Sequence, residues 1–299
     1  MKSIVFIINP VSGVHHERKE KLRNLIPDYF PSDEYKVNVV FSQKSGEGYE
    51  TASRFVAEGT DTLVAVGGDG TVNEIARAVV NTQSRLGIVP LGSGNGLAHF
   101  LKIPFRIEEA LEVIRSGEVI KMDTLRINDI LAVSIAGMGF DARVARQYAL
   151  DQRRGFLTYA RIAFVEYFAY RSRKFRIESP HFSFSVKALL VSIANSDQFG
   201  YNTTIAPQAS VTDGMADIAI VRKIPWHTLL LTGLLLFTRR IDRSRYVSIY
   251  RAPELIITRK KGKYVNIDGE PVKMPRQIHV KVHPASLNIL IPSRFTTHV

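Results

Sequence analysis

Apolar positions in the first 125 residues follow two alternating spacings. Short aliphatic runs predict strands, and stretches with apolar residues every three or four positions predict helices. The predicted strands are Ile4–Ile8, Lys36–Phe41, Leu63–Val66 and Leu86–Val89, and the predicted helices are Glu17–Leu25, Gly48–Glu58, Thr71–Val80 and one that begins at Leu97. Such alternation is typical of an α/β domain with a mostly parallel sheet.

The pattern changes after Asp123, where short strand-like runs separated by turn residues dominate. Many short strands predict a β-sandwich. We therefore expect a domain over 1–125 and a sandwich over 126–284, with the tail 285–299 as a candidate to pack back onto the first domain. Two apolar stretches, Phe156–Tyr170 and Trp226–Phe237, are expected to be core helices; the alternative is that part of their surface lines an acyl-chain groove.

The stretch from Val64 to Glu74 is the most informative in the chain. A strand stops at Gly67, Gly68, Asp69 and Gly70, and a helical pattern follows. A strand that runs through a glycine turn into a helix presents free backbone N–H groups and the positive end of a helix dipole, which suit a phosphate. Asp69 would repel a bare phosphate, so it requires a metal ion, a hydroxyl or an ordered loop to satisfy it.

Three predicted strands run into turn-forming loops: Asn9–Gly13, Gly67–Gly70 and Gly92–Gly96. Loops at the carboxyl ends of parallel strands border the crevice where ligands bind, so we expect the three to share one site. The plainer alternative is that each is only a tight connection. Neither the P-loop motif nor the dinucleotide fingerprint is present.

Acids beside glycine in the second half are further candidates. They occur in Asp213-Gly214-Met215-Ala216-Asp217 and in Asp268-Gly269-Glu270. Asp-Gly is also a common hairpin signal, so a plain turn is the alternative for each. The chain has no cysteine, which excludes disulfides, zinc–thiolate sites and thiol nucleophiles.

The formal net charge is +12, carried partly in arginine and lysine clusters after residues 170, 238 and 258. This charge fits a solvated basic surface, a nucleic-acid partner or an anionic membrane face. The longest apolar run, Leu229–Phe237, is much shorter than the about 20 residues that span a bilayer. We expect a cytoplasmic protein that associates peripherally with membranes and has no nucleic-acid partner, since no aromatic-rich strand is present to stack bases.

Together the motifs resemble the diacylglycerol kinase catalytic-domain family, which includes bacterial diacylglycerol kinases and sphingosine kinases. They follow in order over nearly the whole chain: Asn9-Pro10-x-Ser12-Gly13, Gly67-Gly68-Asp69-Gly70-Thr71-x-Asn73-Glu74, Pro90-Leu91-Gly92-Ser93-Gly94-Asn95, Asp213-Gly214-x-x-Asp217 and Asp268-Gly269-Glu270.

The resemblance implies a phosphofructokinase-like α/β nucleotide domain and a lipid-binding β-sandwich, with the active site in the cleft between them. It implies Glu270 as the base that accepts the lipid hydroxyl proton, with Asp69 as the alternative base, and Asp268 in the same catalytic motif. The residues it implies for ATP are Asn9, Ser42, Gly67, Gly68, Asp69, Gly70, Thr71, Asn73, Gly92, Ser93 and Asn95. A structural Mg²⁺ would be held by Asp213 with the carbonyls of Ser210 and Met215, tied in by Asp123.

Two departures leave the acceptor lipid open. Asn95-Gly96 is closer to the sphingosine-kinase type, and Asn195–Tyr201 replaces a glycine-rich run of the family. The hypothesis is an ATP-dependent, Mg²⁺-using kinase of diacylglycerol, a sphingoid base or a related lipid at an anionic membrane. A homodimer is a further candidate assembly. The alternatives are a soluble-substrate kinase such as NAD kinase and a non-catalytic polyanion-binding module.

Overall fold

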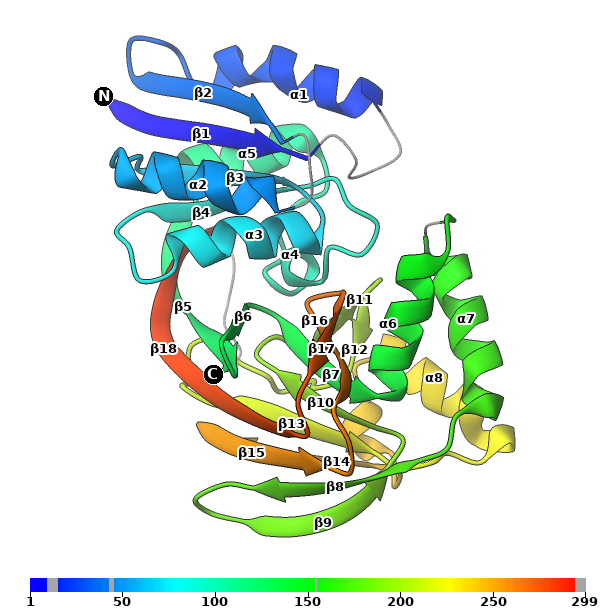
Figure 1. The fold of residues 1–299 in the computed structure, drawn as a ribbon. Helices are drawn as coiled ribbons and strands as arrows, with labels where there is room; N and C mark the ends of the chain where they lie inside the picture. The colour runs from blue at the N-terminus through cyan, green and yellow to red at the C-terminus, as the bar shows by residue number, and fades with distance from the viewer. Residues whose placement is uncertain (10–15, 43–45, 154, 294–299) are drawn as a thin grey trace. The chain divides into compact units, whose positions relative to one another are not determined.

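A computed structural model describes residues 1–9, 16–42, 46–153 and 155–293, and the chain divides into two units (Figure 1). The first comprises Met1–Met122 with the segment from Ala285, and the second comprises Asp123–Pro284. Two strands, β5 (Glu118–Ile127) and β18 (Gln277–Ile291), contribute residues to both.

The first unit is built on parallel strands. In chain order its elements are β1 (Lys2–Ile8), α1 (His16–Tyr29), β2 (Tyr35–Phe41), α2 (Glu47–Ala57), β3 (Thr62–Gly67), α3 (Asp69–Val79), β4 (Arg85–Pro90), α4 (Gly96–Phe100) and α5 (Ile107–Ser116). The strand order is β2-β1-β3-β4, and β18 lies beside β4 where Ile289 pairs with Leu86. The predicted α/β class is confirmed.

Helices cover both faces of this sheet. Apolar side chains of α1 and α5 pack with alternate residues of β1, such as Phe6, in one buried cluster. Helices α2 and α3 pack against each other and lie in front of the sheet in Figure 1. Each strand of the sheet interior is therefore buried on both faces, as its continuous apolar run predicts.

The observed helix boundaries differ from the predicted ones at several places; α1, for example, ends at Tyr29 and not at Leu25. The helix expected from Thr71 begins at Asp69, because Gly68 already serves as its N-cap and an acid is favourable in a first turn. The helix expected from Leu97 stops at Phe100, where Lys102 takes a left-handed conformation (φ 54°) ahead of Pro104; a separate helix, α5, follows.

The second unit is an antiparallel sandwich with helices attached to it. Its further elements are β6 (Ile130–Ala132), β7 (Ile135–Gly139), α6 (Phe140–Leu150), α7 (Phe156–Ala169), β8 (Arg173–Glu178), β9 (Ser183–Ala188), β10 (Leu190–Ala194), β11 (Gln198–Gly200), β12 (Thr203–Thr204), β13 (Ala216–Val221), η1 (Trp226–Thr228), α8 (Leu229–Phe237), η2 (Ile241–Arg243), β14 (Val247–Ala252), β15 (Glu254–Arg259), β16 (Lys263–Ile267) and β17 (Glu270–Met274). One sheet has the order β14-β13-β10-β7-β16-β17, and the facing strands run β18-β15-β8-β9 with the β5–β6 hairpin.

Apolar residues from both sheets of this unit form one buried cluster, which includes Phe175 of β8, Ile218 of β13 and Val265 of β16. Two sheets that share one core make a sandwich, so this prediction is also confirmed.

Helices α7 and α8 are less buried than expected. Only Ile162 and Tyr167 of α7 and Thr232 of α8 are fully buried. Both helices are rich in apolar residues on more than one side, whereas only one side of each packs against the sandwich. The prediction of core helices therefore holds for one side and is wrong for the other. None of the helices within the described ranges has the length and apolarity to cross a bilayer.

Candidate functional site

The carboxyl ends of the parallel strands in the first unit bring several predicted residues to one edge of its sheet. Asn9 follows β1 and donates from Nδ2 to Oγ1 of Thr71, the two atoms being 3.3 Å apart. Ser42 follows β2, is buried, and donates from its backbone N–H to the carbonyl of Ile8. The rest of the Asn9–Gly13 motif lies outside the described residues.

The second and third glycine loops are packed backbone to backbone. The N–H of Gly92 donates to the carbonyl of Gly67 over 3.1 Å, and that of Leu91 donates to the same oxygen over 2.9 Å. A Cβ on Gly92 would lie 2.3 Å from Cα of Gly68, closer than any side chain allows. Glycine at position 92 is therefore required for the two loops to form one surface.

Asn95 completes the shape of the third loop. It has φ 52° and ψ 45°, a left-handed conformation that Asn tolerates better than most residues. Its side chain donates to the carbonyl of Gly92 (2.6 Å) and accepts the N–H of the same residue (3.1 Å). Ser93 stands exposed between these anchors, and a Cβ on Gly94 would lie 2.9 Å from Oδ2 of Asp69.

Asp69 lies in the first turn of α3 and is half-buried. The backbone donors of that turn, with Gly68 as N-cap and Gly70 beside it, offer an anion the positive end of the helix. The carboxylate of Asp69 lies in the same turn and reaches toward Gly94 of the third loop. This geometry suits a phosphate that arrives with a cation, because the cation would offset the like charges.

Glu74 has a role that the sequence analysis did not assign, although the residue closes the glycine-loop motif. Its carboxylate accepts the N–H of Gly46 (2.8 Å) and the N–H of Gly48 (3.1 Å), at the start of α2. An acid at a helix N-terminus satisfies donors that the helix itself leaves unpaired. Glu74 thereby ties the beginning of α2 to α3.

In the second unit, Asp268 and Gly269 form the two-residue turn of the β16–β17 hairpin. Both have positive φ, 47° and 94°, as a type I′ turn requires, and Ile267 pairs with Glu270 across the turn. The hairpin interpretation is therefore correct, and it places Glu270 as the first, exposed residue of β17.

Asp268 is buried and satisfies three backbone donors. Its Oδ2 accepts the N–H of Val133 (2.8 Å), and its Oδ1 accepts those of Ser134 (2.9 Å) and Ile135 (2.8 Å). These contacts join the Glu270 hairpin to the β6–β7 turn. They assign Asp268 a positioning role, and its predicted part in the chemistry stays a prediction.

Asp141, which the sequence analysis did not single out, is buried next to the same hairpin. Its Oδ2 accepts from Nδ2 of Asn266 (3.0 Å), and a Cβ on Gly137 would lie only 1.7 Å from that oxygen. Burial raises the pKa of Asp141 to about 6, partly offset by hydrogen bonds from Asn266 and Tyr159. Only tertiary packing identifies this acid, because its sequence context is an ordinary first turn of a helix.

The predicted magnesium residues are brought together within the second unit. Oδ2 of Asp123 accepts the N–H of Gly214 (2.7 Å), and Oδ1 of Asp213 accepts the N–H of Met215 (3.0 Å). The side chain of Ser210 contacts Thr212 in the same loop.

The other oxygen of Asp213 contacts the guanidinium of Arg251, whose Nε lies 3.6 Å from Oδ2 of the buried Asp217. Carboxylate and carbonyl oxygens fit the donors that Mg²⁺ prefers. Arg251, however, already supplies positive charge to two of the carboxylates. Within the described ranges, no group of three or more acidic or histidine side chains has metal-binding geometry.

Comparison with known proteins agrees with the fold of the two units. The family model of the diacylglycerol kinase catalytic domain matches residues 3–127, and the family model of the YegS C-terminal NAD kinase beta sandwich-like domain matches residues 134–291. Proteins named "Probable lipid kinase YegS-like" from Yersinia pestis (strain Pestoides F) and Yersinia pseudotuberculosis serotype O:1b (strain IP 31758) are each 25% identical over 299 residues, covering 98% of both chains.

Solved structures show the same fold. One described as "Crystal structure of a putative diacylglycerol kinase from Bacillus anthracis str. Sterne" has a TM-score of 0.80 at 19% identity, covering 99% of both chains. A second, of a diacylglycerol kinase from the same strain, has a TM-score of 0.75 at 17% identity. With two family models matched in order along the chain, this protein belongs to the lipid kinase family that joins a diacylglycerol kinase catalytic domain to a YegS-type β-sandwich.

Proposed function

We propose that the protein transfers the γ-phosphate of ATP to a hydroxyl of diacylglycerol, a sphingoid base or a related lipid. The single observation that carries the proposal is the pair of glycine loops packed at the N-terminus of α3, where Gly92 contacts Gly68 and the carboxylate of Asp69 lies beside Gly94. Phosphoryl transfer asks a protein mainly for positioning and charge stabilisation, which such loops supply.

In this proposal different residues bind the phosphates and accept the proton. The backbone donors of the glycine loops orient the phosphates, and the exposed carboxylate of Glu270 accepts the proton of the lipid hydroxyl. A positioned base of this kind contributes about 10²–10⁴ in rate. Mg²⁺, when bound with the nucleotide, would offset the charge between the phosphates and Asp69.

The test uses radiolabelled ATP with mixed lipid micelles, reading which lipid acquires the label. Glu270→Gln is expected to lower turnover by about 10²-fold or more while the protein stays folded, since the side chain is exposed. Unchanged turnover would remove Glu270 as the base.

Asp69→Ala is expected to lower turnover as much as Glu270→Gln does. Label on NAD without any lipid would favour a soluble-substrate kinase, and no ADP release with any acceptor would favour a binding module.

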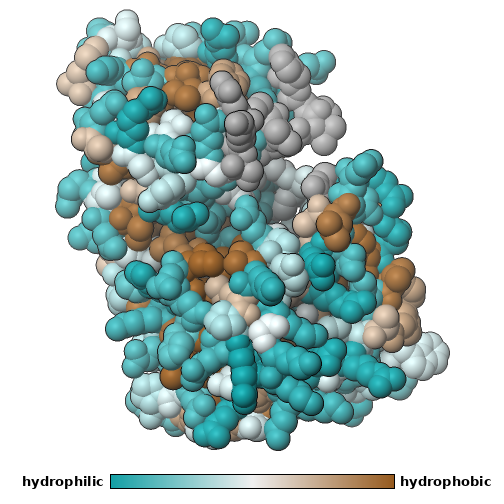
Figure 2. Space-filling model, in the orientation of Figure 1, coloured by the Kyte–Doolittle hydropathy of each residue, from teal (hydrophilic) through white to brown (hydrophobic). Residues whose placement is uncertain are grey.

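We further propose that α7 and α8 dock the protein on an anionic membrane. The two helices lie antiparallel: the rings of Phe156 and Phe237 are 6.0 Å apart at one end, and Lys223 donates to the carbonyl of Tyr167 at the other. Apolar side chains exposed on this pair form what we call the apolar face: Leu157, Phe164, Val165, Phe168, Trp226, Leu230, Leu231, Leu234 and Phe237. Figure 2 shows hydrophobic surface over these helices.

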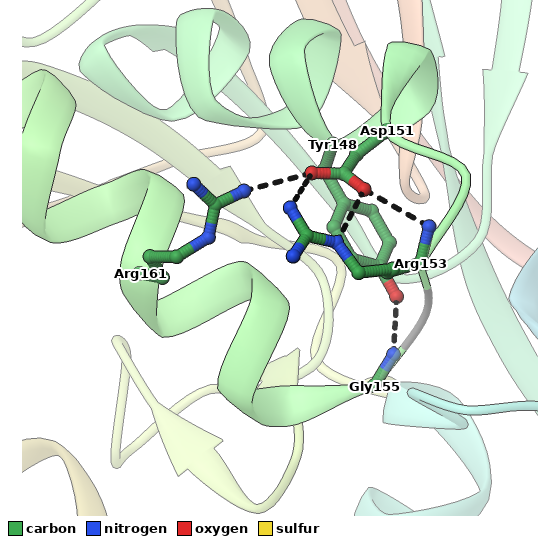
Figure 3. Close-up of polar contacts among 5 residues, drawn as sticks. All are labelled: Tyr148, Asp151, Arg153, Gly155 and Arg161. Carbon is green, nitrogen blue, oxygen red and sulfur yellow. Dashed lines mark hydrogen bonds and ion pairs between the residues drawn. The ribbon is translucent and has the colours of Figure 1, made fainter.

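Polar contacts join the end of α6 to the first half of α7. Asp151, between α6 and α7, accepts from the backbone and side chain of Arg153 and from Arg161, and the N–H of Gly155 donates to the hydroxyl of Tyr148 (Figure 3). Hydrogen bonds from Arg153 hold the pKa of Asp151 below its usual range. Apolar side chains that gather on the exposed surface of neighbouring helices mark an interaction surface.

Basic residues adjoin the apolar face and suit anionic headgroups. Arg240, Arg243 and Arg245 follow α8 and are exposed. Each basic residue near an anionic surface contributes about 1 kcal/mol. Apolar insertion flanked by arginine is the arrangement of interfacial membrane binding.

Trp226, the only tryptophan of the chain and 73% exposed, reports docking directly. Its emission is expected to shift to the blue with phosphatidylglycerol vesicles. Leu230→Glu combined with Leu234→Glu should weaken vesicle binding at least tenfold, because burial of each leucine contributes about 1.5–3 kcal/mol. Phe105→Glu combined with Val119→Glu, at two exposed apolar positions of the first unit, is the matched control with the same charge change. Equal binding by both variants would reject this face.

A further inference from the structure

A cavity of about 950 Å³ lies wholly within the second unit. Residues of α6, the segment that follows α7, strands β8 and β9, the β15–β16 connection and β17 line it. Neither the glycine loops nor Glu270 contributes to this lining. We refer to it as the basic cavity, because arginine and lysine make up half of its lining.

The lining is strongly cationic. Of its twenty residues, four are arginine and six are lysine, and none is acidic. Within the part of the chain that the structure describes, Arg143 is the one cation of the ten that pairs with an acid, Glu166. A solvated basic surface is usually convex and interspersed with acids, whereas here positive charge converges on a concavity.

Arg259 is the buried residue among these ten cations. It is only 7% exposed, and its guanidinium donates to the carbonyls of Lys263 (2.9 Å), Met274 (3.1 Å) and Pro275 (3.0 Å). Its Nε is buried with no hydrogen-bond partner, and the same holds for the hydroxyl of Ser172 in the lining. The guanidinium is thus a buried positive charge, held in place by backbone carbonyls, in the lining of the cavity.

The lysines of the cavity repel their neighbours. The pKa of Lys263 is lowered first by burial and then by the positive charges of Arg173, Arg143, Lys261 and Arg259. A bound anion would relieve this repulsion. The walls are also ordered, because the guanidinium of Arg146 lies over the ring of Tyr264, 4.6 Å from its centre.

We propose that the basic cavity is a second ligand site of this protein and binds a phosphate-bearing anion. Guanidinium and ammonium groups that converge without acids match the charge and the acceptor oxygens of a phosphate dianion. The phosphate could belong to a phosphomonoester lipid headgroup or to a soluble phosphate, since both present the same oxygens. The site requires nothing of the proposed kinase chemistry, because no residue is shared.

The experiment measures binding in two arms with full-length protein. One arm titrates inorganic pyrophosphate by calorimetry, and the other titrates vesicles of phosphatidylcholine with and without phosphatidate. Arg173→Glu combined with Lys263→Glu reverses two exposed lining charges. Arg276→Glu combined with Lys281→Glu is the control, with the same charge change at exposed positions outside the lining.

The cavity variant is expected to bind at least about tenfold more weakly than wild type in one arm or both, whereas the control changes by less than about threefold. Loss in the pyrophosphate arm identifies a soluble phosphate, and loss confined to phosphatidate vesicles identifies a headgroup. The milder pair Arg173→Gln and Lys263→Gln should give an intermediate loss if the reversed pair folds poorly. Equal affinities of cavity and control variants, or no phosphate-dependent binding by wild type, would overturn the proposal.

Discussion

Replacement of Asp268 tests whether this acid positions the Glu270 hairpin or acts in the chemistry. In Asp268→Ala, three buried backbone N–H groups, those of Val133, Ser134 and Ile135, lose their acceptors, which lie at 2.8–2.9 Å in the protein. Each unsatisfied buried donor costs about 1–3 kcal/mol, so the total is about 3–9 kcal/mol. That is comparable with the whole stability of a typical domain, about 5–15 kcal/mol.

Asp268→Asn is the sharper perturbation, because it preserves shape. The amide oxygen can still accept from Ser134 and Ile135, whereas the amide nitrogen faces the N–H of Val133, donor against donor. We expect a loss of about 1–3 kcal/mol. For a unit of this size, each kcal/mol lowers the melting temperature by about 2–4 °C.

Thermal unfolding followed by circular dichroism measures this loss, with Glu270→Gln as the matched control. Glu270 is exposed, so its amide variant should keep the melting temperature while losing turnover. If Asp268→Asn melts with wild type yet loses turnover as Glu270→Gln does, Asp268 acts in the chemistry and the positioning argument fails.

Three further variants have defined outcomes. Gly92→Ala should abolish nucleotide binding in a fluorescence titration with little change in helix content, because its Cβ would lie 2.3 Å from Gly68; retained affinity would contradict the loop packing. Asp141→Asn should remove a pH dependence of the free energy of unfolding. Burial raises the pKa of Asp141 from 3.8 to about 6. The contribution of this acid to wild-type stability, up to about 3 kcal/mol, is therefore complete below about pH 4 and is lost as the pH rises through 6. Parallel stability–pH curves from pH 4 to 7 would refute it. Arg251→Met should lower the melting temperature by leaving the buried Asp217 without its positive neighbour, and added Mg²⁺ should restore part of it; no Mg²⁺ effect would argue against a cation site there.

The sequence alone predicted the elements and the chemistry that depend on local pattern. Apolar periodicity located most strands and helices of the first unit and predicted many short strands in the second, and the Asp268-Gly269 turn followed from the positive φ that a two-residue hairpin demands. The glycine loops indicated a phosphate site because glycine has no side chain to keep an anion away from the backbone N–H groups. Local pattern was misleading for α7 and α8. Their apolar residues predicted core helices but did not show which side of each helix would pack against the sandwich.

The tertiary structure decided every property that depends on residues distant in the chain. It showed that Gly92 must be glycine because Gly68 lies against it, that the carboxylate of Asp268 serves the turn at Val133–Ile135, and that burial changes the acidity of Asp141. It also gathered ten cations from separate elements around one cavity. The physical reason is common to all of these: periodicity and turn preference are properties of neighbours in sequence, whereas burial, close approach and convergent charge exist only once the chain has folded.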